Sequence, residues 1–155
     1  CGYGFPSILG AKIGCPNTPV IGFAGDGAFG ISMNEMSSCA RKEWPNITMV
    51  IFRNYQWGAE KRNSILWFDD NFVGTELDPE LSYSKVATAC GLKGVTVKTM
   101  EETTKAIKQS CEDQKNGITT FIEVILNQEL GEPFRRDAMK KPVEVAGINS
   151  SDMNN

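Results

Sequence analysis

Short apolar runs that alternate with helix-like segments constrain the fold of this chain more than any other feature. The runs are rich in β-branched residues and bounded by Gly, Pro, Asn or Asp, which is typical of buried strands. They span residues 18–25, 46–54, 94–98 and 118–126. The other segments have helical spacing or helix-end residues. These span residues 6–14, 28–42, 78–91 and 100–113. This alternation predicts an α/β fold: a doubly wound parallel sheet with helices on both faces.

The chain has the size of one domain. Its 155 residues, 41% of them apolar, are enough to bury one core, and we place this domain at residues 1–126. Residues 55–77 are rich in aromatic and charged side chains and predict a long functional loop with a short helix. Residues 127–155 form a polar tail, whose end has the composition of a disordered segment.

Composition excludes several classes of function. The net charge is -3 and the basic residues are scattered, so we expect no nucleic-acid partner. No apolar run approaches the roughly 20 residues that cross a bilayer, so we expect no membrane partner. The cysteines number five and form no CxxC pair, which argues against a disulfide framework and a zinc site and favours the cytoplasm.

The absence of histidine narrows the chemistry further. It excludes a Ser-His-Asp triad, a Cys-His dyad and every histidine-ligated metal centre. A metal in this chain must therefore be held by oxygen atoms, which favours magnesium or calcium.

The stretch VIGFAGDGAFG, residues 20–30, is the strongest candidate for a binding site. An Asp-Gly pair is most often a tight turn, and for Asp26 taken alone that alternative stays open. Here a strand precedes the pair and a helical segment follows it, an arrangement that directs backbone N–H groups at an anion. An aspartate at such a place would repel a phosphate unless a cation lies between them. A magnesium ion bound to a diphosphate resolves this conflict.

Asn54 supplies a second oxygen for the same ion. It follows the next predicted strand, and neighbouring parallel strands would bring it close to Asp26. Ligands of such sheets bind outside the carboxyl ends of the strands. The two residues together predict a magnesium diphosphate site.

At these residues the sequence resembles the thiamine diphosphate-dependent enzymes. The Gly-Asp-Gly of residues 25–27, the spacer of residues 28–53 and Asn54 are similar to the cofactor motif of that family. The blocks GYGFPSILGAKIG and NYQWG, which flank the motif, also resemble its diphosphate-binding domain. The resemblance spans residues 1–126 and implies thiamine diphosphate and Mg²⁺ as cofactors.

The resemblance also implies roles for single residues. Asp26 and Asn54 would give side-chain oxygens to magnesium, and Gln56 would give its backbone carbonyl. The residues implied around the rest of the cofactor are Gly25, Gly27, Ala28, Phe29, Trp57 and Gly58. Cys1 falls where the family usually has a larger apolar residue that props the cofactor. Arg53 stands where the motif commonly has a first asparagine, and the ligand asparagine follows it.

No catalytic residue is assigned within the chain. The family activates its cofactor with a glutamate from a separate pyrimidine-binding domain, which reaches across a subunit interface. We find no candidate for that domain in 155 residues. We therefore expect a longer protein that forms a homo-oligomer, a dimer or a tetramer, and we expect this chain to be inactive alone. Its start at Cys1, inside a Gly-rich segment, favours a missing upstream part.

Three blocks resemble the sulfoacetaldehyde acetyltransferases more than the acetolactate synthases or pyruvate oxidases. They are QWGAEKRN, DDNFVGTELD and ELGEPFRRDAMKKPV. The resemblance implies small-molecule substrates, sulfoacetaldehyde and inorganic phosphate, which are converted into acetyl phosphate and sulfite. A sulfonate and a phosphate call for basic side chains, above all the planar guanidinium group. The candidates are Lys61, Arg62, Arg135 and Arg136.

Several alternatives stay open at this point. Each of the four basic residues, taken alone, is more simply explained as a member of an ordinary surface ion pair. A carboligase like acetolactate synthase, or an enzyme like pyruvate oxidase, would share the cofactor motif. A non-catalytic phosphate-binding module would share the fold.

Overall fold

A computed structural model describes residues 1–130 of the chain. The chain divides into two compact units. The first unit comprises Cys1–Trp57 and Glu76–Gln128. The second comprises Gly58–Thr75 and the segment from Glu129 onward. The predicted boundary at residue 126 stays a prediction.

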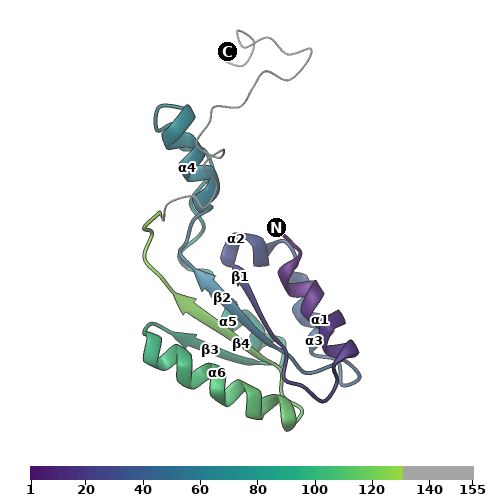
Figure 1. Ribbon diagram of the computed structural model, residues 1–155. Helices are drawn as coiled ribbons and strands as arrows, with labels where there is room; N and C mark the ends of the chain where they lie inside the picture. Colours follow the sequence, from purple (N-terminus) through teal and green to yellow (C-terminus); the bar gives the residue numbers. More distant parts are fainter. Residues whose placement is uncertain (131–155) are drawn as a thin grey trace, which may run out of the picture. The chain divides into compact units, whose positions relative to one another are not determined.

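A four-stranded parallel sheet forms the centre of the first unit (Figure 1). Its strands are β1 (Ile21–Gly25), β2 (Thr48–Arg53), β3 (Lys93–Val97) and β4 (Thr120–Ile125). They lie in the order β1-β2-β4-β3, so the chain crosses over between strands that are not neighbours in sequence. The predicted α/β fold with a parallel sheet is confirmed.

Helices cover both faces of this sheet. On one face, α1 (Gly4–Gly14) and α5 (Tyr83–Ala89) pack on the larger apolar core. On the other face, α6 (Met100–Lys115) packs on a smaller cluster. Side chains along β2 alternate between the two, because successive residues of a strand point to opposite faces: Met49 and Ile51 lie in the larger core and Val50 in the smaller cluster. The doubly wound arrangement is therefore present.

The segment after β1 differs from the single helix predicted over residues 28–42. It forms α2 (Asp26–Gly30), the 3₁₀ helix η1 (Met33–Glu35) and α3 (Met36–Cys39). Ser32 breaks the helix, since its φ of -116° is not helical and its N–H donates to the Phe29 carbonyl at 3.0 Å in a tightened turn. The predicted continuous helix is wrong, and helical structure starts at Asp26 itself.

Helix α5 begins later than the sequence predicts. Asp78, the first residue of the predicted segment, lies outside the helix, and its carboxylate accepts the Glu80 N–H at 2.8 Å in a turn. The actual N-cap is Ser82, whose hydroxyl accepts from the Lys85 N–H. The predicted stop at Gly91 holds, because that residue has a φ of +81°, a conformation that suits glycine after a helix.

The described part of the second unit is dominated by α4 (Gly58–Trp67), the short helix predicted within the loop. The ammonium group of Lys61 lies 5.6 Å from the centroid of the Phe72 ring in the same unit. Among residues 1–130, no helix has both the length and the apolar composition of a membrane span.

Candidate cofactor and metal site

Asp26 directly follows β1 at its carboxyl end and is the first residue of α2. Its side chain is only 3% exposed. One carboxylate oxygen, Oδ1, accepts the Gly27 N–H at 2.9 Å, and the other, Oδ2, accepts the Tyr55 N–H at 2.9 Å. Each oxygen keeps a lone pair for a further ligand. Two backbone donors therefore fix the orientation of the carboxylate, one from the segment after β1 and one from the segment after β2.

The turn after β2 carries Asn54 to the same place. Gly25 pairs with Phe52 in the parallel ladder, so the two strands end side by side. Tyr55 has a φ of 61°, the left-handed conformation that a non-glycine residue seldom adopts. In this conformation its N–H reaches Asp26, and the Asn54 amide oxygen accepts the Gln56 N–H at 3.4 Å. The predicted approach of the residues around Asn54 to Asp26 is confirmed by the Tyr55 hydrogen bond.

Gln56 is held by its side chain. The side chain is 2% exposed, and its Nε2 donates to the Gln128 carbonyl at 2.8 Å. On the main chain, Gln56 forms an antiparallel bridge with Glu76, and Leu77 donates its N–H to the Tyr55 carbonyl at 2.8 Å. These bonds fix the position of the Gln56 backbone, so its carbonyl has a defined place beside the turn.

The glycines of the Gly-Asp-Gly stretch differ in their surroundings. A Cβ atom added at Gly25 would meet nothing within 4 Å, so the space beside this residue is open. A Cβ atom added at Gly27 would lie 2.6 Å from Cδ1 of Trp57, so the indole ring covers that glycine directly. Trp57 itself is 46% exposed. The backbone at Gly25 is therefore accessible to a ligand, and the Trp57 indole borders this space at Gly27.

Three other predicted cofactor residues have distinct positions. Phe29 is fully buried in the core, with its ring centroid 5.1 Å from that of Phe5, so only its main chain is available to a cofactor. The Ala28 carbonyl accepts the Gly2 N–H at 3.2 Å, which brings the start of the chain against α2. Cys1 precedes this contact and is exposed. Gly58 begins the second unit.

The predicted anion-binding residues are only partly described. Lys61 and Arg62 lie on α4 in the second unit and are half-buried. Arg135 and Arg136 lie outside the described residues. Their contact with a substrate stays a prediction.

Sequence reasoning missed a buried ionic network behind the Asp26 turn. Arg53 and Glu123 are each 1% exposed, and the Nε of Arg53 lies 3.2 Å from Oε1 of Glu123. The Tyr83 hydroxyl donates to the main-chain carbonyl of Asp26 at 3.2 Å. Burial raises the pKa of Tyr83 and the nearby carboxylate of Asp26 raises it further, so the phenol keeps its proton at neutral pH. The sequence carries two signals for this network: a glutamate inside the apolar strand TFIEVI and an arginine at the end of the strand TMVIFR.

The available donors suit a metal that is shared with a bound phosphate. Within residues 1–130 no group of three or more acidic or thiol side chains could hold a metal by itself. The turn offers one carboxylate, one amide oxygen and one backbone carbonyl. Magnesium takes one or two carboxylates and completes its octahedron with neutral and phosphate oxygens, so this donor set fits a magnesium diphosphate.

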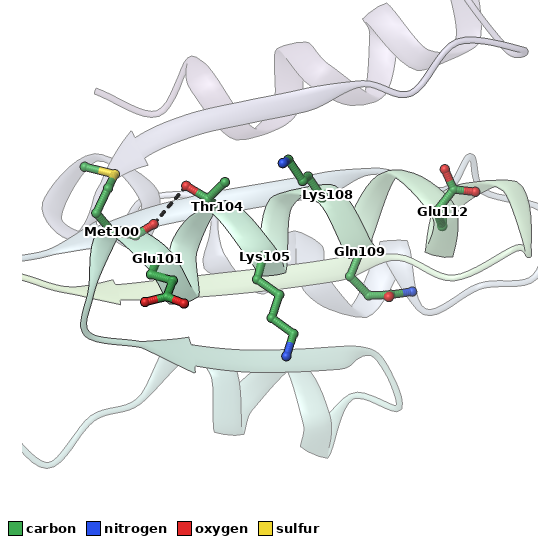
Figure 2. Close-up of a pocket in the computed structure, with 7 residues that line it drawn as sticks. All are labelled: Met100, Glu101, Thr104, Lys105, Lys108, Gln109 and Glu112. Carbon is green, nitrogen blue, oxygen red and sulfur yellow. Dashed lines mark hydrogen bonds between the residues drawn. The ribbon is translucent and has the colours of Figure 1, made fainter.

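A separate hollow of about 740 Å³ lies along α6 (Figure 2). All of its described lining residues belong to that helix, among them Met100, Thr104 and Lys108. The Thr104 hydroxyl is already used within the helix, where it donates to the Met100 carbonyl at 2.9 Å. All of the described residues that line it are exposed, as is typical of a surface groove along a helix.

Comparison with known families decides the family of the chain. Residues 1–124 match the family "Thiamine pyrophosphate enzyme, C-terminal TPP binding domain". The chain belongs to this thiamine pyrophosphate (thiamine diphosphate) enzyme family. The predicted resemblance is thereby confirmed, and the Asp26 turn lies within the matched part of the domain.

Individual relatives agree with this assignment. The chain is 75% identical over 153 residues to a probable sulfoacetaldehyde acetyltransferase of Rhizobium meliloti, a match that covers 99% of the chain and 26% of the relative. It is 69% identical to a sulfoacetaldehyde acetyltransferase of Roseovarius nubinhibens, covering 99% of the chain and 25% of the relative. The chain thus spans about a quarter of the length of these curated relatives. The predicted resemblance to the sulfoacetaldehyde acetyltransferases is confirmed.

A solved structure supports the fold of the thiamine diphosphate-binding domain. A thiamine diphosphate-dependent 4-hydroxybenzoylformate decarboxylase of Rhodococcus jostii RHA1 superimposes with a TM-score of 0.73 at 28% identity. The superposition covers 84% of this chain and 24% of the decarboxylase.

Proposed function

We propose that this chain is the diphosphate-binding part of a cytoplasmic, homo-oligomeric acetyltransferase that depends on thiamine diphosphate and Mg²⁺. The enzyme converts sulfoacetaldehyde and phosphate into acetyl phosphate and sulfite. The observation that carries the choice of reaction is the 75% and 69% identity to sulfoacetaldehyde acetyltransferases over 99% of the chain. The predicted activating glutamate belongs to a pyrimidine-binding domain elsewhere in the protein.

The metal ligands we assign are the Asp26 carboxylate, the Asn54 amide oxygen and the Gln56 backbone carbonyl. This set is supported by the two backbone N–H groups that orient the Asp26 carboxylate. It is also supported by the bond from the buried Gln56 side chain to Gln128, which fixes the backbone that bears the third ligand. The single carboxylate leaves a net positive charge on the ion, which attracts the diphosphate.

The diphosphate itself lies, in this proposal, against the backbone of the Asp26 turn. The first N–H groups of a helix have no acceptor within the helix, and in α2 two of them belong to Gly27 and Ala28, whose small side chains allow close approach. The open space at Gly25 supports this position. Trp57 covers Gly27 and shields one side of the turn from water. Ala28 and Phe29, which the sequence also predicts beside the cofactor, would contribute through main-chain atoms.

Substrate binding needs positive charge near an anionic cofactor. When bound, thiamine diphosphate supplies the carbanion chemistry that breaks the carbon–sulfur bond of sulfoacetaldehyde. Lys61, Arg62, Arg135 and Arg136 are proposed to hold the sulfonate and the phosphate, since guanidinium and ammonium groups pair with both anions.

The test of the reaction uses the full-length gene product that carries this chain. It is supplied with sulfoacetaldehyde, phosphate, thiamine diphosphate and Mg²⁺, and sulfite and acetyl phosphate are measured. We expect both products in equal amounts, and neither without the cofactor. Formation of acetolactate from pyruvate, with no sulfite from sulfoacetaldehyde, would favour the carboligase alternative.

A matched pair of variants tests the metal ligand. Asp26→Asn keeps the shape of the side chain and removes its charge, whereas Asp70→Asn makes the same change at an exposed residue of the second unit. Loss of an outer-shell partner typically weakens metal binding 10- to 100-fold, so loss of a ligand charge should weaken Mg²⁺-dependent binding of thiamine diphosphate at least about 10-fold. Unchanged cofactor affinity in Asp26→Asn would return Asp26 to the role of a turn residue.

A further inference from the structure

The buried Arg53–Glu123 pair lies beside both tyrosines that bond to Asp26, the first residue of the candidate metal site. The Arg53 guanidinium lies 4.4 Å from the ring centroid of Tyr55 and 5.0 Å from that of Tyr83. Tyr55 donates its backbone N–H to the Asp26 carboxylate, and Tyr83 donates its hydroxyl to the Asp26 carbonyl. Arg53 is therefore packed between the two residues that hold Asp26.

Arg53 is itself fixed by bonds to other elements. Its Nε pairs with Oε1 of Glu123 on β4 at 3.2 Å, and its Nη2 donates to the Asp78 carbonyl at 2.8 Å. The remaining nitrogen, Nη1, is buried and has no hydrogen-bond acceptor among the described residues. A guanidinium with one donor unused gains compensation from the faces of aromatic rings. The contacts of the Arg53 guanidinium with the two rings therefore accompany an incomplete set of hydrogen bonds.

Glu123, the partner of Arg53, also binds the start of α5. Its Oε2 accepts the Ser82 hydroxyl at 2.7 Å and the Ser84 N–H at 3.1 Å, and its Oε1 accepts the Tyr83 N–H at 3.2 Å. The helix start is therefore anchored on β4, and Tyr83, its first residue, is aimed at Asp26. The ring of Tyr83 also packs edge-on against Phe29 of α2, with centroids 5.3 Å apart.

We propose that Arg53, Glu123 and Tyr83 are positioning residues for the metal site. They do not touch the metal or the substrate. Tyr83 holds the Asp26 main chain through its hydroxyl, and Arg53 holds the Tyr55 ring and so keeps that residue in its left-handed conformation. As a result, the Asp26 carboxylate and the Asn54 amide can bind the same metal ion. This inference rests on the proposed function, because it concerns the geometry of the proposed magnesium ligands.

The choice of metal distinguishes positioning from general stability. Magnesium requires nearly ideal octahedral geometry, whereas calcium accepts flexible geometry and variable ligand number. A loss of alignment should therefore weaken Mg²⁺-dependent binding more than Ca²⁺-dependent binding. A merely structural defect would lower the folded fraction and affect both metals equally.

The experiment is a calorimetric titration of the full-length gene product with thiamine diphosphate, at fixed Mg²⁺ or fixed Ca²⁺. Tyr83→Phe removes only the hydroxyl, and Tyr3→Phe is the matched control at a residue that is 80% exposed. We expect Tyr83→Phe to raise the dissociation constant about fivefold with Mg²⁺, the factor that corresponds to one neutral hydrogen bond, and less than about twofold with Ca²⁺. Tyr3→Phe should equal the wild type with both metals.

Arg53→Lys provides a second variant. It keeps the positive charge beside Glu123 but removes the planar group between the two rings. We expect the same selective loss with Mg²⁺. Equal weakening with both metals, or no weakening in either variant, would overturn the positioning role while leaving the proposed function intact. Absence of metal-dependent cofactor binding in the wild type would overturn the proposed function itself, and this inference with it.

Discussion

The buried Arg53–Glu123 pair gives the clearest prediction about stability. Both side chains are 1% exposed, so neither charge can be solvated if its partner is removed. We consider Glu123→Gln, which keeps the size of the side chain but leaves the Arg53 guanidinium without a counter-charge in the core. Breaking a buried pair in this way costs about 3–5 kcal/mol, because an uncompensated charge remains.

The hydrogen bonds of Glu123 indicate which of the two single substitutions, Glu123→Gln or Arg53→Met, lowers the free energy of unfolding more. Its carboxylate also accepts three donors from Ser82, Tyr83 and Ser84 at the start of α5. In Arg53→Met the carboxylate therefore keeps three hydrogen-bond donors, whereas in Glu123→Gln the arginine loses its paired carboxylate and keeps the Asp78 carbonyl and the two tyrosine rings. We expect Glu123→Gln to destabilise the chain more than Arg53→Met does.

A double-mutant cycle measures the interaction between the two charges. Urea unfolding of the wild type, both single variants and Arg53→Met/Glu123→Gln is followed by circular dichroism. The double variant removes both charges of this pair and leaves neither uncompensated, so its loss of stability should be smaller than the sum of the single losses by about 2 kcal/mol or more. Losses that add within about 0.5 kcal/mol would refute the idea that the two charges compensate each other.

Three further predictions concern single residues elsewhere in the first unit. Thr99→Ala removes the capping box at the start of α6 and should lower the free energy of unfolding by about 1 kcal/mol in urea. Gly94→Ala would place a Cβ atom against the Ser84 carbonyl, so we expect it to lower the free energy of unfolding by about 3 kcal/mol. Gly10→Ala places its Cβ atom in open space on α1 and should leave the stability unchanged or raise it. Equal urea midpoints of unfolding for the two variants would contradict this pair of predictions. Burial raises the pKa of Asp113, but hydrogen bonds from its lysine, glutamine and threonine neighbours outweigh this and lower it below the usual 3.8. The carboxylate therefore stabilises the fold above about pH 4, and this stability is lost as the pH falls further; Asp113→Asn should flatten that part of the pH profile, and an unchanged profile would exclude the role.

The strands and their order of appearance could be predicted from the sequence. Each is a compact apolar run with turn residues at its ends, and a parallel sheet buried on both faces produces that pattern directly. The approach of the Asn54 turn to Asp26 followed from the same reasoning, because neighbouring parallel strands end at one edge of the sheet. These features depend on local pattern and on topology alone.

The parts that could not be predicted depend on tertiary contacts. Nothing local indicates that Arg53 pairs with Glu123, since 70 residues separate them in the sequence. The left-handed conformation of Tyr55 is stabilised by its bond to Asp26, and such strained conformations persist only where the surroundings enforce them. The start of α5 moved from Asp78 to Ser82 for the same kind of reason, since Ser82 also bonds to Glu123.

The most direct test of the account is the location of the metal itself. Crystals of the full-length gene product are grown with thiamine diphosphate and Mn²⁺, which replaces Mg²⁺ and can be located by its anomalous scattering. We predict one peak within about 2.0–2.3 Å of an Asp26 carboxylate oxygen, the Asn54 amide oxygen and the Gln56 carbonyl. Bound thiamine diphosphate with no Mn²⁺ peak at these atoms, or with a peak held by other residues, would contradict the proposed site.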